Sequence, residues 1–60
     1  MYTIIMKRGS KPDLIRERNS WSAAFDCASS LAELHGLQSK DIIEDEEAHT
    51  FTLDASEYYS

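Results

Sequence analysis

The stretch from Ser20 to Leu37 has the clearest separation of apolar and polar positions in the chain. At about 100° per residue, one side of a helix collects Trp21, Ala24, Phe25, Ala28, Leu31, Ala32 and His35. Serines and acidic residues fall opposite, as is typical of a helix that lies on an apolar surface. The three alanines, spaced by four, predict a close approach to a flat sheet, with Trp21, Phe25 and Leu31 as the large plugs.

Both ends of this predicted helix carry termination signals. Ser20 or Ser22 is placed to cap the first turn, because a serine oxygen accepts a hydrogen bond from a free backbone N–H there. Gly36 is placed to end the helix with a positive φ, and Leu37 would then fold back on the last turn.

The residues before the helix predict a β-hairpin. Tyr2–Met6 is β-branched and aromatic, which favours a strand. Gly9–Asp13 has turn chemistry, because glycine permits positive φ and Pro12 fixes φ and lacks a donor. Leu14–Asn19 is the predicted return strand. Its alternation is poor, since Leu14 and Ile15 are adjacent.

The residues after the helix predict a second hairpin. Gln38–Lys40 is a connector, Asp41–Asp45 is a short strand, and Asp45–Ala48 is the turn. His49–Leu53 is the return strand and has the cleanest period-two pattern in the chain. His49, Phe51 and Leu53 are expected to face the core.

A second helix over Ser39–Ala48 is the competing interpretation, since glutamate and alanine are good helix formers. Against it, Ile42 and Ile43 are the only large apolar residues of this segment, and its consecutive acidic residues repel one another. The hairpin is therefore favoured.

The predicted order ββαββ indicates an α+β fold. It is a small two-layer domain in which one amphipathic helix covers one face of an antiparallel sheet. Residues 1–54 form this single domain, and residues 55–60 are expected to be a flexible C-terminal tail. Tyr58 and Tyr59 are the tail residues most suited to dock on the domain.

Length and composition narrow the partners. Sixty residues bury little surface, and the lone Cys27 forms no internal disulfide. Cys27, His35 and His49 lack metal-ligand spacing, so no metal or cofactor is expected. A homodimer is the remaining common way to stabilise such a domain, for example by a first or last strand that extends the partner's sheet.

Several classes of protein are disfavoured. No apolar run approaches the roughly 20 residues of a membrane helix, and Met1–Met6 is too short for a signal-peptide core. We therefore expect a soluble cytoplasmic protein with no membrane partner. No nucleophile elbow or phosphate loop is present, and so small a chain has little room for a catalytic pocket. We expect that it is not an enzyme.

Charge is distributed unevenly along the chain. Residues 1–20 contain five basic against two acidic residues, a net charge of +3, and residues 21–60 contain one basic against nine acidic residues, a net charge of −8. A basic set lies on the predicted first hairpin: Lys7, Arg8, Lys11, Arg16 and Arg18. This set is suited to polyanion contact, but the net charge of −5 argues against nucleic acid as the main partner.

The acidic residues suggest a different partner. An acidic run lies in and after the third predicted strand: Asp41, Glu44, Asp45, Glu46 and Glu47. Fixed carboxylates would be attracted to a basic cleft and would compete there with a nucleic acid. The run is therefore a candidate partner-binding surface.

The hypothesis that follows is a small acidic protein–protein interaction module. Its size and acidity look like those of the accessory proteins of phages and mobile elements that bind and modulate a host protein. The alternatives are an acidic DNA-mimic inhibitor of a nucleic-acid enzyme and a weak nucleic-acid binder that uses the basic hairpin.

Overall fold

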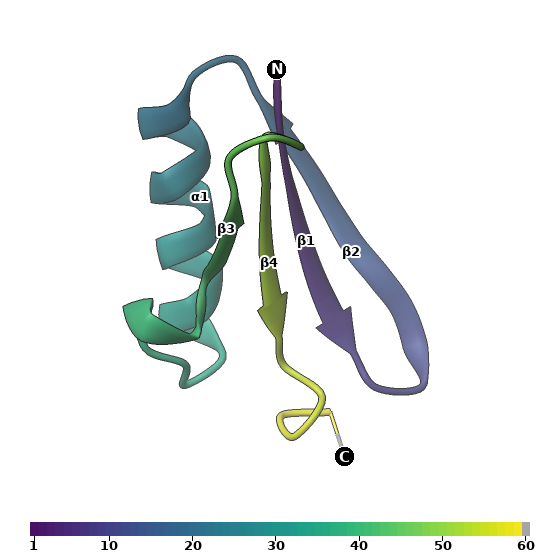
Figure 1. The fold of residues 1–60 in the computed structure, drawn as a ribbon. Coiled ribbons are helices and arrows are strands. Elements are labelled where there is room, and N and C mark those ends of the chain that lie inside the picture. Colours follow the sequence, from purple (N-terminus) through teal and green to yellow (C-terminus); the bar gives the residue numbers. More distant parts are fainter. Residues whose placement is uncertain (60) are drawn as a thin grey trace.

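A computed structural model describes residues 1–59 as a four-stranded sheet with one helix against one face (Figure 1). The elements are β1 (Tyr2–Arg8), β2 (Lys11–Arg18), α1 (Trp21–Leu34), a 3-10 turn η1 (Ser39–Asp41), β3 (Ile43–Asp45) and β4 (Thr50–Asp54). The predicted α+β class and the ββαββ order are confirmed.

The sheet has the strand order β2-β1-β4-β3, and each hairpin is antiparallel. The hairpins meet through β1 and β4, which run parallel, so the sheet is mixed rather than wholly antiparallel as predicted. The cause is the length of α1. Its 14 residues span about 21 Å, close to the roughly 23 Å of β1, so it carries the chain back along the sheet once. The inner strands of both hairpins therefore run the same way.

The most apolar strands occupy the centre of the sheet. Ile4 and Met6 of β1 and Phe51 and Leu53 of β4 are buried against α1. The charged strands β2 and β3 form the edges, where charged side chains reach water and hinder sheet-to-sheet aggregation. We expected the first or last strand to extend a partner's sheet. That expectation is wrong, because β1 and β4 are already paired on both sides.

The capping predictions for α1 are confirmed. The Ser20 Oγ accepts a hydrogen bond from the Ala23 N–H at 3.2 Å. At the other end Gly36 has φ +71°, and the Leu37 N–H donates to the Ala32 carbonyl at 2.7 Å, as in a Schellman stop.

The alanines of α1 bring the helix close to the sheet. Ala24 and Ala28 are fully buried and Ala32 nearly so. The prediction that Trp21, Phe25 and Leu31 fill the core is wrong. Trp21 is 43% exposed, and Phe25 and Leu31 are only half-buried and pack against the core. The volume under the helix is filled by strand side chains instead.

The second hairpin is confirmed, and the competing helix over residues 39–48 is wrong except for the single turn η1. The expected core position of His49 is also wrong. His49 is exposed, has φ +52° and ends the turn before β4, while its ring stacks on Tyr2 at a centroid distance of 4.7 Å. Tight hairpin turns need a residue with positive φ, and that requirement overrides the period-two pattern here.

The first hairpin is longer than predicted, with its turn reduced to Gly9 and Ser10. Pro12 lies within β2, beside a register irregularity. An edge strand tolerates proline, because the missing N–H is not needed for pairing on the outer side.

The chain after β4 packs against the domain. Ala55 is buried in the core, and its N–H donates to the Lys7 carbonyl at 2.8 Å. The rings of Tyr58 and Tyr59 contact His35 at the end of α1, in agreement with the expectation that these two tail residues are the most suited to dock on the domain. Flexibility of residues 55–60 stays a prediction, and Ser60 lies outside the described residues.

Candidate functional site

The two charged sets lie toward opposite edges of the sheet. The basic set comes from β1 and β2, and β2 forms one edge. The acidic run extends from η1 along β3, the other edge, to the turn before β4. The run therefore follows one edge of the sheet.

Three of the five carboxylates in the acidic run accept hydrogen bonds from the rest of the chain. Glu44 accepts from the Trp21 Nε1–H at 2.9 Å. Asp41 accepts from the Gln38 N–H at 2.8 Å, and Asp45 accepts from the Ala48 N–H at 3.1 Å. These bonds join β3 to the start of α1 and hold the turns at both ends of β3. The carboxylates therefore have structural roles, whatever they bind.

The basic residues contact the hairpin and the C-terminal turn. Arg8 Nε donates to the Pro12 carbonyl at 2.8 Å. The Arg8 guanidinium and the Lys11 ammonium lie 5.7 and 5.9 Å from the centroid of the Tyr59 ring, within the range of cation–π attraction. Arg16 and Arg18 each donate to the carbonyl of the preceding residue.

His35 links the end of α1 to the C-terminal turn. Its Nδ1 lies 2.7 Å from the Leu31 carbonyl and its Nε2 lies 2.9 Å from the Tyr59 hydroxyl. A carbonyl only accepts, so Nδ1 carries a proton, and Nε2 of the neutral ring accepts from tyrosine. Within residues 1–59, no group of three or more His, Cys, Asp or Glu side chains is placed to hold a metal ion.

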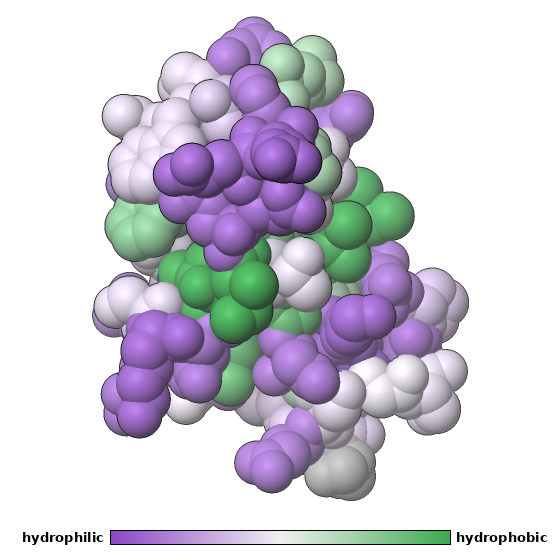
Figure 2. Space-filling view, viewed as in Figure 1, coloured by the Kyte–Doolittle hydropathy of each residue, from purple (hydrophilic) through white to green (hydrophobic). Residues whose placement is uncertain are grey.

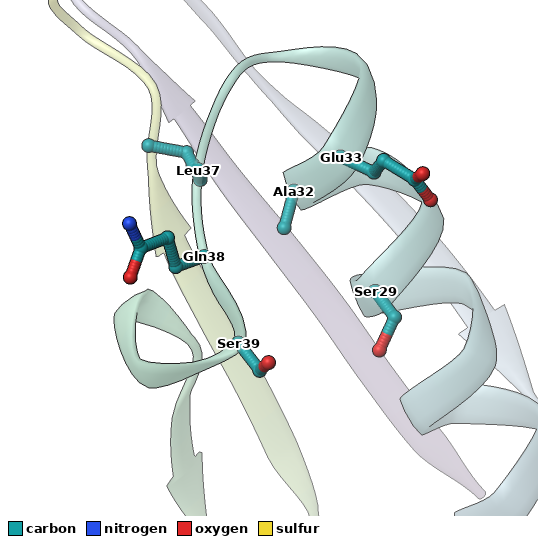
Figure 3. A pocket seen from close by; sticks show the side chains of 6 residues that line it. All are labelled: Ser29, Ala32, Glu33, Leu37, Gln38 and Ser39. Carbon is teal, nitrogen blue, oxygen red and sulfur yellow. The ribbon is translucent and has the colours of Figure 1, made fainter.

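Two open depressions lie beside the end of α1, each with a volume of about 470 Å³. Figure 3 shows the first, whose side chains come from the helix and from the segment that leads to η1 and do not converge on one point. The second is lined by His35, Gly36, Leu37, Asp41, Asp54, Ala55, Ser56, Glu57 and Tyr58. The second lining contains a serine, a histidine and carboxylates, but their hydrogen bonds do not link a nucleophile to a base. The Ser56 hydroxyl donates to Asp54, and the two His35 ring nitrogens bond to the Leu31 carbonyl and the Tyr59 hydroxyl.

The face of the sheet opposite α1, here called the open face, carries a feature that was not predicted. The register aligns one residue from each strand into a row that crosses the whole sheet: Ile15, Ile5, Thr52 and Ile43. Ile15 is 56% exposed and Ile43 is 63% exposed. Figure 2 shows apolar surface on both sides of a paler centre across the middle of the sheet, with hydrophilic residues above and below.

The sequence contains a signal for this row. Each of the three isoleucines in the row directly follows an apolar residue in the sequence: Ile4–Ile5, Leu14–Ile15 and Ile42–Ile43. Neighbouring strand residues point to opposite faces, so an adjacent apolar pair within a strand places an apolar side chain on each face. The poor alternation at Leu14 and Ile15 was an indication of a second apolar face.

Polar rows flank the isoleucines on the open face. Thr3 is paired with Thr50 on one side, and Lys7 is paired with Asp54 on the other. The pKa of Asp54 is lowered from its usual 3.8, chiefly because the Ser56 hydroxyl and then the Ser56 N–H donate to its carboxylate, with the Lys7 charge as a further cause. Lys7 and Asp54 thus form a pair of opposite charges on the two central strands, where β1 and β4 end.

Asp54→Asn is expected to lower the free energy of unfolding at neutral pH, with a difference from wild type that narrows in acid. Because folding depresses the pKa of Asp54, its ionised form stabilises the fold above the unfolded-state pKa, and this contribution is lost as pH falls through the folded-state pKa. Urea titrations of both proteins from pH 7 to pH 2 measure the difference in their free energies of unfolding. A difference that does not change with pH would contradict this assignment.

Within residues 1–59, no helix is long and apolar enough to cross a membrane. Compared with protein-family models, curated proteins and solved structures, the chain matches none.

Proposed function

We propose that this protein is a protein–protein interaction module that binds its partner with the open face of the sheet. The observation that carries the proposal is the row of Ile15, Ile5, Thr52 and Ile43 across all four strands. Exposed apolar side chains that are contiguous and rimmed by polar residues mark interaction sites, whereas scattered ones do not.

The energetics favour use of this face. A sheet covered on one side by a helix normally presents polar residues to water on the other side. Here three isoleucines lie in one row across that side, and burying an isoleucine contributes about 1.5–3 kcal/mol. Threonines and charged residues around them supply a polar rim, as at specific interfaces.

The acidic run and the basic set support the other two hypotheses less well. Three of the acidic side chains already accept hydrogen bonds within the fold, and the run follows one edge of the sheet. Arg8 and Lys11 lie against Tyr59, and the arginines of β2 bond to their own backbone. DNA mimicry and nucleic-acid binding stay predictions.

The test compares single lysine substitutions on and off the open face. Ile15→Lys and Ile43→Lys alter the row, and Leu34→Lys is the matched control, because Leu34 is 72% exposed and lies on α1. Substitutions at such exposed positions usually change stability by about 0.5 kcal/mol or less.

Tagged wild type and each variant are used to capture partners from the lysate of the source cell, and a second copy of the chain counts as a partner. We expect wild type and Leu34→Lys to retain the same partner and both isoleucine variants to lose it. Equal capture by all four proteins, with circular dichroism showing each to be folded, would reject the proposal.

A further inference from the structure

We propose that the occupant of the open face is a second copy of this chain. This inference rests on the proposed function and names its partner. The two copies stack face to face about a two-fold axis that runs parallel to the strands, between β1 and β4. Three features support this arrangement: the size of the face, the pairing of its apolar row, and the placement of its charges.

The size of the face is sufficient for a weak dimer. The strands β1, β2, β3 and β4 have seven, eight, three and five residues, and at about 4.8 Å between strands and 3.3 Å per residue they make a face of roughly 360 Å². Specific interfaces bury about 800 Å² on each partner, so this smaller face fits a weak, transient dimer. We therefore expect a dissociation constant on the order of micromolar.

The proposed axis reverses the strand order between the copies. It places β2 over the partner's β3 and β1 over the partner's β4, with all strand directions preserved. Ile15 then lies over the partner's Ile43, and Ile5 lies over the partner's Thr52. Each isoleucine at the edge of one sheet is covered by an isoleucine of the other sheet.

The same axis brings opposite charges together. Lys7 and Asp54 are register partners on the two central strands, so Lys7 lies over the partner's Asp54 and Asp54 over the partner's Lys7. The four side chains form a square of alternating charge. Glu17 also approaches the partner's Asp45, and these two carboxylates repel each other. They lie on the edge strands, where the angle of about 30° between stacked sheets separates the strands and water screens the repulsion.

Other symmetric arrangements match the surface less well. A two-fold axis perpendicular to the strands would place Lys7 over the partner's Thr3 and Asp54 over the partner's Thr50, with no opposite charges aligned. Edge-to-edge pairing would bring two copies of β2, with its basic residues, or two copies of the acidic β3 together. Like charges opposite each other destabilise such pairs.

The test uses a charge exchange measured by sedimentation equilibrium at several protein concentrations. Lys7→Asp alone gives four negative charges in the square, and Asp54→Lys alone gives four positive charges. We expect each variant to raise the dissociation constant at least tenfold. In an equimolar mixture the two negative side chains of one variant face the two positive side chains of the other across the interface, and this pair is expected to form a heterodimer about as tight as the wild-type dimer.

Two further variants define the face. Ile43→Lys is expected to be monomeric, and Leu34→Lys is expected to dimerise like wild type. Since Asp54→Lys removes the acceptor for the Ser56 N–H, a second design replaces both charges by neutral groups of similar shape, Lys7→Met with Asp54→Asn. Its dimer is expected to be weaker than wild type and to lose the salt dependence that wild type shows.

The outcomes separate the two proposals. A wild type that is monomeric at every concentration overturns the second copy as occupant, while the partner capture still tests the open face. A dimer that survives Ile43→Lys places self-association elsewhere and overturns this inference. The proposed axis is overturned by a third outcome. In it Ile43→Lys disrupts the dimer, but the mixture of Lys7→Asp and Asp54→Lys does not restore dimerisation and the neutral double variant keeps the salt dependence of wild type.

Discussion

Phe51→Ala is expected to leave a large fraction of the protein unfolded at 25 °C. Phe51 is 1% exposed and is the largest fully buried side chain. Its ring meets Trp21 and Phe25 edge-on, with centroids 5.9 and 6.0 Å away. Truncation of a buried phenylalanine costs about 3–5 kcal/mol, because apolar burial is lost and a cavity remains.

The size of the chain makes this loss decisive. At roughly 0.05–0.15 kcal/mol per residue, sixty residues provide a total stability of about 3–9 kcal/mol. Urea titration followed by the fluorescence of Trp21 measures the loss. The control is Phe25→Ala, because Phe25 also contacts Trp21 but is only half-buried, so its truncation should cost less. Equal losses in the two variants would show that the core is centred elsewhere.

Ala28→Leu is expected to destabilise the protein by about 1–3 kcal/mol, although leucine is a good helix former. Ala28 is fully buried in the middle of the alanine row that faces the sheet. A leucine there has no free volume to occupy, since Ile4, Met6 and Leu53 fill the same layer. The helix must then move away from the strands or adopt strained rotamers.

Thermal unfolding of Ala28→Leu measures this effect. The control is Ala23→Leu, because Ala23 lies on the same helix but is only half-buried. The two substitutions have equal helix propensity, so a difference between them reports packing alone. If both variants melt at the wild-type temperature, α1 does not rest on the sheet through its alanines.

The local elements follow from the sequence because their causes are local. The serine cap, the glycine stop and the apolar face of α1 each depend on residues within a few positions of one another. Turn residues and β-branched runs likewise predicted both hairpins. The errors at strand ends, such as His49, arose where a turn required a backbone conformation that the alternation of side chains does not reveal.

The charged candidates illustrate a different limit. Sequence shows that Asp41 to Glu47 is acidic, but it does not show which carboxylates the fold itself uses. The bond between Glu44 and Trp21 joins residues 23 positions apart, and it exists because β3 lies beside the start of α1. Only the folded chain separates carboxylates that hold structure from carboxylates that face water.

Local signals were enough to predict one helix and two hairpins, because propensity, caps and turns act over short distances. Only the tertiary structure decided that β1 and β4 lie side by side in parallel, since strand neighbours depend on how the hairpins dock. That pairing aligned Ile15, Ile5, Thr52 and Ile43 in one row and set Lys7 beside Asp54. The residues of the open face are far apart along the chain, and non-local strand pairing brings them together.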